Sequence, residues 1–254
     1  MKVVLLAGGF GTRLSEYTDV IPKPMVQIGG LPILVHIMKH FSKYGHKDFI
    51  IALGYKSEVI KDFFINYKTL NSDFSIDFKT GELKIHNSCD DDWKVTLIDT
   101  GSTSMTGGRL KRLEKYLENE TFFLTYGDGL SNVNLDELLK KHKKHGKIAT
   151  VTAVHPNARF GEMNIYEDIV TEFKEKPQTQ MGWINGGFFV MNPGIFNYIE
   201  GDQTVLEKEP LENLSKESEL VSFKHEGFWQ CMDSKRDKDY LEDLYINGNC
   251  LWEN

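Results

Sequence analysis

The chain has few cysteines, no long apolar run and no excess of basic charge over its 254 residues. No segment approaches the roughly 20 apolar residues of a membrane-spanning helix, and the first residues lack the longer apolar stretch of a signal peptide. Cys89, Cys231 and Cys250 lie far apart, without the spacing of a metal site or a disulfide framework. The formal net charge of −7 argues against non-specific nucleic-acid binding. These absences predict a reduced, cytoplasmic protein that binds neither membranes nor nucleic acids.

The residues that are present have an ordinary globular composition, 40% hydrophobic and 26% charged. Through residue 154 the pattern alternates between short apolar runs and segments of helical periodicity. The predicted strands are 2–6, 48–53, 95–99, 121–125 and 148–154, and the predicted helices are 32–44, 57–67, 107–117 and 135–145. Such alternation predicts an α/β fold with a Rossmann-like, mostly parallel sheet flanked by helices on both faces.

The pattern changes after about residue 159, where short strands become more frequent. A hairpin is expected earlier, at 73–86, with its turn at Thr80-Gly81. The later predicted strands are 163–165, 169–175, 183–191, 220–224 and 227–232, and the later predicted helices are 194–200, 207–216 and 235–247. No linker, repeat or low-complexity stretch divides the chain, so we expect one domain, 1–254, with antiparallel strands added late.

A glycine-rich segment follows the first predicted strand. It reads Leu6, Ala7, Gly8, Gly9, Phe10, Gly11, Thr12, Arg13. Ligands bind beyond the carboxyl ends of strands in open α/β sheets, and glycine lets backbone N–H groups approach a phosphate. A P-loop would need Gly-Lys-Ser/Thr, and a dinucleotide fingerprint would need glycine in place of Leu14. Arg13 supplies a phosphate-binding fork, so we predict a phosphate site, with a plain glycine-rich turn as the alternative.

One lysine is held between two prolines in the segment Pro22-Lys23-Pro24. The prolines restrict the backbone on both sides of the lysine. A lysine in a stiff, extended segment is well placed to act as a point charge on phosphate. The alternative is a surface lysine in a turn.

A carboxylate stands between two glycines in Gly127-Asp128-Gly129, directly after a predicted strand. Mg²⁺ typically uses one or two carboxylates together with substrate phosphates. Asp-Gly is also a common turn, so a metal site needs a second carboxylate. Asp233 offers one at the end of a late strand. The run 90–92 of three aspartates is a rival that we interpret as a solvated cluster.

Two more charged segments have a structural interpretation beside a functional one. Glu175 and Lys176 precede a proline and could hold a phosphate and a hydroxyl, or could belong to a charged edge strand. The basic run 140–145 contains His142 and His145 at a spacing seen in metal sites. It lies on one predicted helix of an acidic chain, so we expect a solvated face with exposed histidines.

Taken together, these segments resemble the sugar-1-phosphate nucleotidylyltransferases. The opening Leu-Ala-Gly-Gly-Phe-Gly-Thr-Arg-Leu, then Pro-Lys-Pro-Met, is similar to the signature of that family. Further segments resemble its cytidylyltransferase branch: 99–101 (Asp-Thr-Gly), 105–112 (Met-Thr-Gly-Gly-Arg-Leu-Lys-Arg), 126–129 (Tyr-Gly-Asp-Gly), 159–161 (Arg-Phe-Gly), 183–189 (Trp-Ile-Asn-Gly-Gly-Phe-Phe) and 227–230 (Gly-Phe-Trp-Gln). The similarity spans nearly the whole chain and implies the nucleotide-diphospho-sugar transferase type of fold.

The resemblance implies a reaction in which CTP and α-D-glucose 1-phosphate give CDP-glucose and pyrophosphate, a precursor for O-antigen deoxysugars of bacterial surface polysaccharide. It implies that the glycine-rich segment and Thr12 hold the nucleotide and that Arg13 and Lys23 neutralise its phosphates. Mg²⁺ ligands are implied at Asp128 and Asp233. Roles in sugar-phosphate binding are implied for Gly161, Glu175, Lys176 and Asn185, and contacts near the base and ribose for Ser104 and Arg109.

The resemblance also implies which parts of the chain bind each substrate and how the chain assembles. The nucleotide-binding part would cover about 1–130 and the sugar-phosphate-binding part about 131–254. A homo-oligomer is implied, a hexamer in this branch. One departure stands out beside a proposed metal ligand: Cys231 and Ser234 occupy positions where the family pattern has Pro and Thr. Cys231 removes one backbone restraint there.

Three other hypotheses can be weighed against this one. The same fold could use another sugar phosphate or nucleotide, since discrimination depends on a few groups. An inactive sugar-nucleotide sensor should have lost Arg13, Lys23, Asp128 or Asp233, and all four are present. A glycosyltransferase with a similar nucleotide-binding half would carry an Asp-x-Asp motif instead of the glycine-rich loop.

Overall fold

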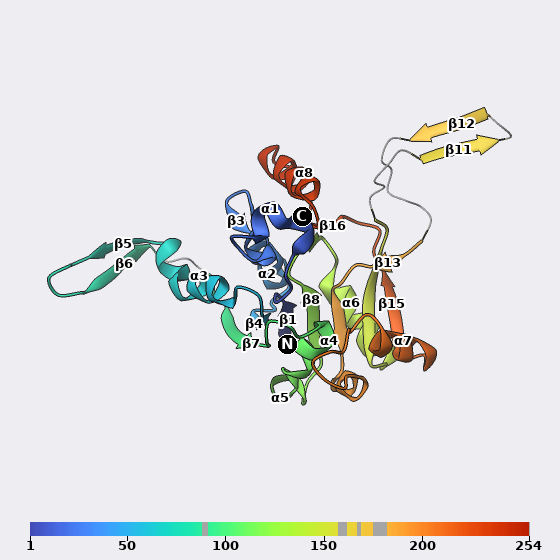
Figure 1. Ribbon diagram of the computed structural model, residues 1–254, viewed down its shortest axis with the longest axis horizontal. Coiled ribbons are helices and arrows are strands. Elements are labelled where there is room, and N and C mark those ends of the chain that lie inside the picture. Colours follow the sequence, from blue (N-terminus) through green and yellow to red (C-terminus); the bar gives the residue numbers. More distant parts are fainter. Residues whose placement is uncertain (88–90, 157–161, 167–168, 175–181, 254) are drawn as a thin grey trace.

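The structure is a computed structural model that describes residues 1–254 except 88–90, 157–161, 167–168, 175–181 and 254 (Figure 1). Its strands are β1 (Lys2–Leu6), β2 (Gln27–Ile28), β3 (Leu31–Pro32), β4 (Asp48–Leu53), β5 (Asp73–Ile76), β6 (Leu83–Asn87), β7 (Lys94–Asp99), β8 (Phe122–Tyr126), β9 (Gly129–Ser131), β10 (Ala149–Val154), β11 (Glu162–Tyr166), β12 (Ile169–Lys174), β13 (Ile184–Asn185), β14 (Phe189–Met191), β15 (Leu220–Lys224) and β16 (Trp229–Cys231).

The helices alternate with these strands through the first half of the chain. They are η1 (Thr12–Leu14), α1 (Ser15–Thr18), η2 (Lys23–Met25), α2 (Ile33–Lys43), α3 (Ser57–Leu70), α4 (Thr106–Lys111), α5 (Glu114–Leu117), α6 (Leu135–His145), η3 (Pro193–Tyr198), α7 (Glu209–Lys216) and α8 (Lys235–Ile246), where η marks a 3-10 helix. Among the described residues, none of the helices is long and apolar enough to cross a membrane.

The main sheet has a parallel half and a mixed half. Within the described residues it contains eight strands, ordered β13-β10-β14-β8-β1-β4-β7, with β15 paired to β10. β8, β1, β4 and β7 run parallel, whereas β14 is antiparallel to both β8 and β10. The predicted α/β fold, mostly parallel with late antiparallel strands, is confirmed.

Helices cover both faces of this sheet because the central strands are apolar on both sides. In β1, Val3 and Leu5 point to a core closed by α2, α3, α6 and α8, while Val4 and Leu6 point to a second core closed by α4, α5, η3 and α7. Buried strands of parallel sheets are typically continuous apolar runs of this kind. The two cores fix the parallel half of the sheet on both faces. The candidate site lies at the carboxyl ends of these strands.

Two hairpins extend away from this body (Figure 1). β5 and β6 pair antiparallel and form the hairpin predicted around Thr80-Gly81. β11 and β12 pair antiparallel as the late hairpin. The β5–β6 hairpin exposes large apolar side chains, with Phe78 89% exposed and Phe74 45% exposed. Isolated two-stranded hairpins are marginally stable in water, so this arm gains little stability from its own contacts.

Some predicted elements differ from the observed ones. The strand expected at 183–191 is two short strands, because Gly187 (φ 74°) and Phe188 (φ 46°) turn the backbone into the left-handed region between them. The helix expected at 107–117 is divided into α4 and α5, and the one at 194–200 is the 3-10 helix η3. The other boundaries agree within a few residues.

The histidines of α6 are the clearest error in the sequence interpretation. We expected a solvated pair, but His142 is only 2% exposed. Its Nδ1 lies 2.9 Å from the Thr150 hydroxyl, and Nε2 of His145 lies 2.7 Å from the same oxygen. The pair joins α6 to β10 and is a packing feature. The lysines between the two histidines make the segment hydrophilic, so its pattern does not indicate that one side of this helix is buried.

Candidate active site

A cleft of about 640 Å³ opens at the carboxyl ends of β1 and β8. It is the place at which open α/β sheets bind ligands. Many predicted site residues line it: Leu6, Ala7, Gly8, Gly9, Phe10, Gly11, Thr12, Arg13, Lys23, Ser104, Arg109, Asp128, Asn185 and Asp233. Gly161, Glu175 and Lys176 lie outside the described residues. The structure therefore brings together, in one cleft, segments that are far apart in sequence, such as Arg13 and Asp233, which are separated by 220 residues.

Lys23 meets Asp128 because a glycine allows the two loops to approach each other. A Cβ at Gly127 would lie 3.0 Å from Pro24 Cγ and 3.2 Å from the Leu6 carbonyl. The Gly127 N–H donates to that carbonyl at 3.0 Å, which ties the loop after β8 to the end of β1. Any larger residue at 127 would press against Pro24 and separate the lysine from the carboxylate.

Asp233 reaches the same point through strand pairing. β16 pairs antiparallel with β9, with Cys231 opposite Gly129, so the end of β16 lies beside Asp128. The Met232 N–H donates to the Asp128 carbonyl at 2.9 Å. Asp237 in α8 accepts from the Asp233 N–H at 3.1 Å and forms a capping box with Ser234. The start of α8 therefore holds the backbone of Asp233 through Asp237, and the Ser234 hydroxyl caps the helix by bonding Asp237.

The charged groups form a compact cluster of two cations and two carboxylates. Lys23 Nζ lies 2.6 Å from both Asp128 Oδ2 and Asp233 Oδ1, and Arg13 also pairs with Asp233. Burial alone lowers the pKa of Lys23, but the two carboxylates outweigh it and raise the pKa above its ordinary value. Burial raises the pKa of Asp233, but Lys23 and Arg13 hold it below the ordinary value. Both partners therefore stay charged at neutral pH.

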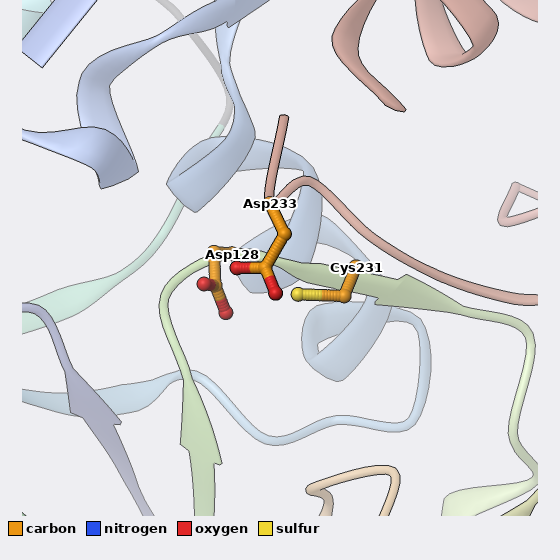
Figure 2. Close-up of side chains that lie close together, drawn as sticks. All are labelled: Asp128, Cys231 and Asp233. Atoms are coloured by element: carbon orange, nitrogen blue, oxygen red, sulfur yellow. The ribbon is translucent and has the colours of Figure 1, made fainter. Parts of the chain in front are cut away.

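Cys231 completes a group of three side chains that converge on one point (Figure 2). One ligand atom from each of Asp128, Cys231 and Asp233 lies within 4.8 Å of the others. The two carboxylates suit a hard divalent cation that also binds phosphate oxygens, which fits Mg²⁺. Burial and the neighbouring carboxylates raise the pKa of the Cys231 thiol, which keeps it protonated. The oxygens are thus the fitting ligands, and the neutral sulfur is a neighbour.

Arg109, which we expected near the base and ribose, makes its hydrogen bonds within the protein. It is 4% exposed and lines the cleft, but its guanidinium is occupied by neutral oxygens of the loops around it. These are Gly8 O (2.8 Å), Leu53 O (3.1 Å), Thr100 Oγ1 (2.9 Å), Gly101 O (2.6 Å) and Ser102 O (3.4 Å). A Cβ at Gly8 would lie 2.2 Å from this guanidinium, so the glycine is needed for the approach. Arg109 holds the glycine-rich loop in place.

Ser104 and Asn185 line the cleft from two different parts of the fold. Ser104 is 7% exposed and lies just before α4, and Asn185 ends β13. Asn185 donates from Nδ2 to the Tyr126 hydroxyl at 3.2 Å and accepts from the Gly187 N–H at 2.9 Å. Both residues are thus in the cleft, as expected.

Sequence reasoning assigned no role to Tyr126, which lines the cleft, or to Glu207 behind it. Tyr126 lies directly before the Gly-Asp-Gly motif and donates to Glu207 at 2.5 Å. Glu207 precedes α7 and has no motif around it that signals a role. Of the rival aspartate run, Asp92 pairs with Lys47 and neither Asp91 nor Asp92 lines the described cleft, whereas Asp90 lies outside the described residues.

Comparison with known proteins agrees with this geometry. The family described as Nucleotidyl transferase matches residues 2–233. A glucose-1-phosphate cytidylyltransferase of Salmonella typhi is 50% identical over 254 residues, covering 100% of this chain and 99% of that protein. A mannose-1-phosphate guanyltransferase of Saccharomyces cerevisiae is 33% identical, covering 98% of this chain and 65% of its own length. The crystal structure of HddC from Yersinia pseudotuberculosis has a TM-score of 0.70 and 25% identity, covering 96% of this chain and 99% of that chain.

Proposed function

We propose that this chain, which belongs to the nucleotidyl transferase family and to its glucose-1-phosphate cytidylyltransferase branch, transfers the cytidylyl group of CTP to α-D-glucose 1-phosphate. The products are CDP-glucose and pyrophosphate. The observation that carries this proposal is the charged cluster of Lys23, Asp128, Asp233 and Arg13, set beside the glycine-rich loop in a chain with full-length similarity to such enzymes.

In this reaction a phosphate oxygen of the sugar phosphate attacks the α-phosphorus of CTP in line. The bond from the α-phosphorus to the bridging oxygen breaks, and pyrophosphate leaves with its electron pair. The nucleophile is already anionic at neutral pH, so the reaction needs no general base and no covalent intermediate. Catalysis then depends on positioning and on neutralising phosphate charge.

The described cations are suited to that task. Lys23 is half-buried between two acids, whereas the Arg13 side chain is 75% exposed at the rim of the cleft. We assign Lys23 to the α-phosphate and Arg13 to the triphosphate and the leaving pyrophosphate. Backbone N–H groups of the glycine-rich loop, with Thr12, would hold the nucleotide. Ser104 faces the base and ribose, and Arg109 acts by supporting the loop from behind.

Asp128 and Asp233 would hold the Mg²⁺. The bound ion supplies positive charge shared between the phosphates of the two substrates. Lys23 contacts both carboxylates and, with Arg13, holds the pKa of Asp233 below its ordinary value, so the chain itself prepares an acidic pair for a divalent cation. Cys231 contributes no hard oxygen ligand and leaves that pair as the donor set.

The sugar phosphate would bind on the side of Asn185. We assign Asn185 and Glu175 to sugar hydroxyls and Lys176 to the sugar phosphate, with Gly161 allowing close approach, as the family resemblance implies. The reaction belongs in the cytoplasm, where CTP is available, and its product would supply deoxysugars of surface polysaccharide.

A homo-oligomer is part of the proposal, and the β5–β6 hairpin supports it. The arm leaves the body and exposes Phe74, Ile76, Phe78 and Leu83, each at least 42% exposed. Exposed apolar patches of this kind mark interaction surfaces. Light scattering should give a multiple of 29.2 kDa for the chain. Phe78→Ser should lower the mass, whereas Lys79→Ser beside it should not; a monomeric native chain would remove the oligomer from the proposal.

Pyrophosphate release tests the activity itself. The purified chain is assayed with Mg²⁺ against CTP, UTP, dTTP, ATP and GTP, each crossed with several sugar 1-phosphates. Release with CTP and glucose 1-phosphate alone is expected. Release with another pair would retain the fold and mechanism and change the specificity. Folded protein that binds nucleotide but releases pyrophosphate with no pair would favour the sensor hypothesis.

A further inference from the structure

A chain of hydrogen bonds runs behind the sugar side of the cleft, from Gly187 to Thr106. The Gly187 N–H donates to Asn185 Oδ1 at 2.9 Å, and Asn185 Nδ2 donates to the Tyr126 hydroxyl at 3.2 Å. That hydroxyl donates to Glu207 Oε1 at 2.5 Å. Glu207 Oε2 accepts from the Thr106 hydroxyl at 2.6 Å. Asn185, Tyr126 and Thr106 line the cleft, whereas Glu207 lies behind them.

The direction of every bond in this chain follows from its two ends. A backbone N–H only donates, so the Asn185 carbonyl oxygen must face Gly187 and its amide nitrogen must face Tyr126. The amide nitrogen also only donates, so the Tyr126 oxygen must accept. The single phenolic proton is then directed to Glu207, whose carboxylate only accepts. Burial and the charge of Glu207 raise the pKa of Tyr126, which keeps that proton in place.

From this geometry we infer that Glu207 is a positioning residue for sugar-phosphate recognition: by taking the phenolic proton it leaves the Tyr126 oxygen free to accept from Asn185, and so gives the carboxamide, which Gly187 orients, its second anchor. The inference rests on the proposed function, in which Asn185 contacts sugar hydroxyls. Without the carboxylate, the phenolic proton is free to turn toward Asn185, where it opposes the amide N–H. The amide then keeps only its bond from the Gly187 N–H, so its position toward the sugar hydroxyls is held less firmly.

Glu207 also joins the two walls of the cleft. Glu207 accepts from the hydroxyl of Thr106, which is the first residue of α4. That hydroxyl accepts in turn from the Leu206 N–H at 2.9 Å. The segment around Glu207 packs closely on α4, since the Gly108 N–H donates to the Thr204 carbonyl at 3.2 Å. The variant Tyr126→Phe removes only the sugar branch of this network and leaves the bond between Thr106 and Glu207. It therefore separates the two branches.

Steady-state kinetics of Glu207→Leu and Tyr126→Phe test the inference, because leucine removes the acceptor that a glutamine would keep. We expect the KM for glucose 1-phosphate to rise about three- to ten-fold in both, the effect of one lost hydrogen bond, with the KM for CTP within about two-fold in Tyr126→Phe. In an Asn185→Ala background each substitution should change that KM by less than about two-fold, because the group they orient is gone. Glu209→Gln, on the exposed start of α7, is the matched control and should change neither KM.

The inference would be overturned if the KM effects of these substitutions added to that of Asn185→Ala. It would also be overturned if Tyr126→Phe raised the KM for glucose 1-phosphate and the KM for CTP equally.

A measurement independent of turnover separates failure of this inference from failure of the proposed function. In protein labelled with ¹⁵N-asparagine, the side-chain amide signal of Asn185 is the one that Asn185→Ala removes. Glu207→Leu and Tyr126→Phe should shift that signal, while Glu209→Gln should not. An unshifted signal would overturn the inference even if the native chain turned over CTP; a chain inactive with every pair would overturn the proposed function alone.

Discussion

Two cationic regions face the same cleft and are neutralised in different ways. Lys23 and Arg13 are neutralised by acids, Asp128 and Asp233, in a cluster whose side chains are 12–75% exposed. Arg109 is 4% exposed, and its hydrogen bonds go to backbone carbonyls and one threonine hydroxyl. Ions paired with ions can exchange partners when phosphates and a divalent cation arrive. Arg109 cannot leave in the same way, because the Gly101 carbonyl would lose its donor and the Gly8 and Leu53 carbonyls would each lose one of theirs.

We expect this difference to separate residues that act on substrate from residues that support the site. A charged residue lining the cleft is therefore not a sufficient sign of substrate contact. The partners decide: a carboxylate partner marks a charge that substrate can replace, and carbonyl partners mark a scaffold. The substitutions below should affect the first region in activity and the second in stability.

The largest effect is expected for Asp128→Asn. The change keeps the shape of the side chain but removes a proposed metal ligand and half of the neutralisation of Lys23. We expect kcat/KM for pyrophosphate release to fall at least about 10³-fold, with a thermal midpoint within a few degrees of the native one. Asp136→Asn, exposed on α6, is the control and should retain full activity. Near-native rates in Asp128→Asn would exclude Asp128 from the metal site.

Arg109→Met should mainly cost stability. The substitution keeps much of the apolar volume but removes the donor to the Gly101 carbonyl and one of the donors to the Gly8 and Leu53 carbonyls, which Tyr55 and Thr100 still serve. We expect the free energy of unfolding, measured by urea denaturation, to fall by about 1–3 kcal/mol. Arg13→Met makes the same chemical change on an exposed side chain and should alter stability by less than about 0.5 kcal/mol while lowering kcat. If both variants lost stability equally, the distinction between the two regions would fail.

Acid should weaken the fold before it neutralises the charged cluster. His40 is 5% exposed and contacts the Val133 carbonyl at 3.0 Å, and burial lowers its pKa from 6.5 to about 4. Below pH 6.5 the unfolded chain binds a proton that the folded chain resists, so stability falls as pH falls from 6.5 toward 4, by about 3 kcal/mol in total for this residue. The pKa of buried His36 is lowered as well, mainly by burial, which adds to the trend.

Urea denaturation at several pH values between 7.5 and 4.5 measures this loss. In His40→Phe the slope of stability against pH in that window should be shallower than in the native chain. Asp233, whose pKa is held low by Lys23 and Arg13, should remain ionised across the same window. A pH-independent free energy of unfolding would show that His40 is not held neutral.

The sequence predicted the elements whose signal is local. α6 begins at Leu135 and ends at His145 as predicted, because Asn134 caps it and Gly146 ends it in the left-handed region. β4 and β15 have the predicted bounds. The break between β13 and β14 was missed because Phe188, which the apolar run placed in a strand, adopts a positive φ imposed by its surroundings.

The site was predicted only in part for a related reason. Lys23, Asp128 and Asp233 belong to recognisable motifs, and their convergence follows from the strand order. Whether an arginine serves a ligand or a loop depends on its neighbours in space, so the support role of Arg109 could not be inferred from its segment. Glu207 has no local signal at all, since its partners Tyr126 and Thr106 are 81 and 101 residues away.

The smallest expected effect concerns Cys231, which reports on the charge balance of the cluster. Burial is the first cause of its raised pKa, and the charges of Asp128 and Asp233 add to it, while Lys23 opposes them. Because the thiolate is the reactive form, neutral iodoacetamide at pH 8 should modify Cys231 at least about ten-fold more slowly than a peptide thiol. A Cys89→Ser/Cys250→Ser background isolates the signal in mass spectrometry. Adding Asp128→Asn should accelerate the modification, since it removes a negative charge and leaves Lys23 in place. An unchanged rate would mean that burial alone controls the thiol, and that the paired charges beside it are balanced too closely for one acid to matter.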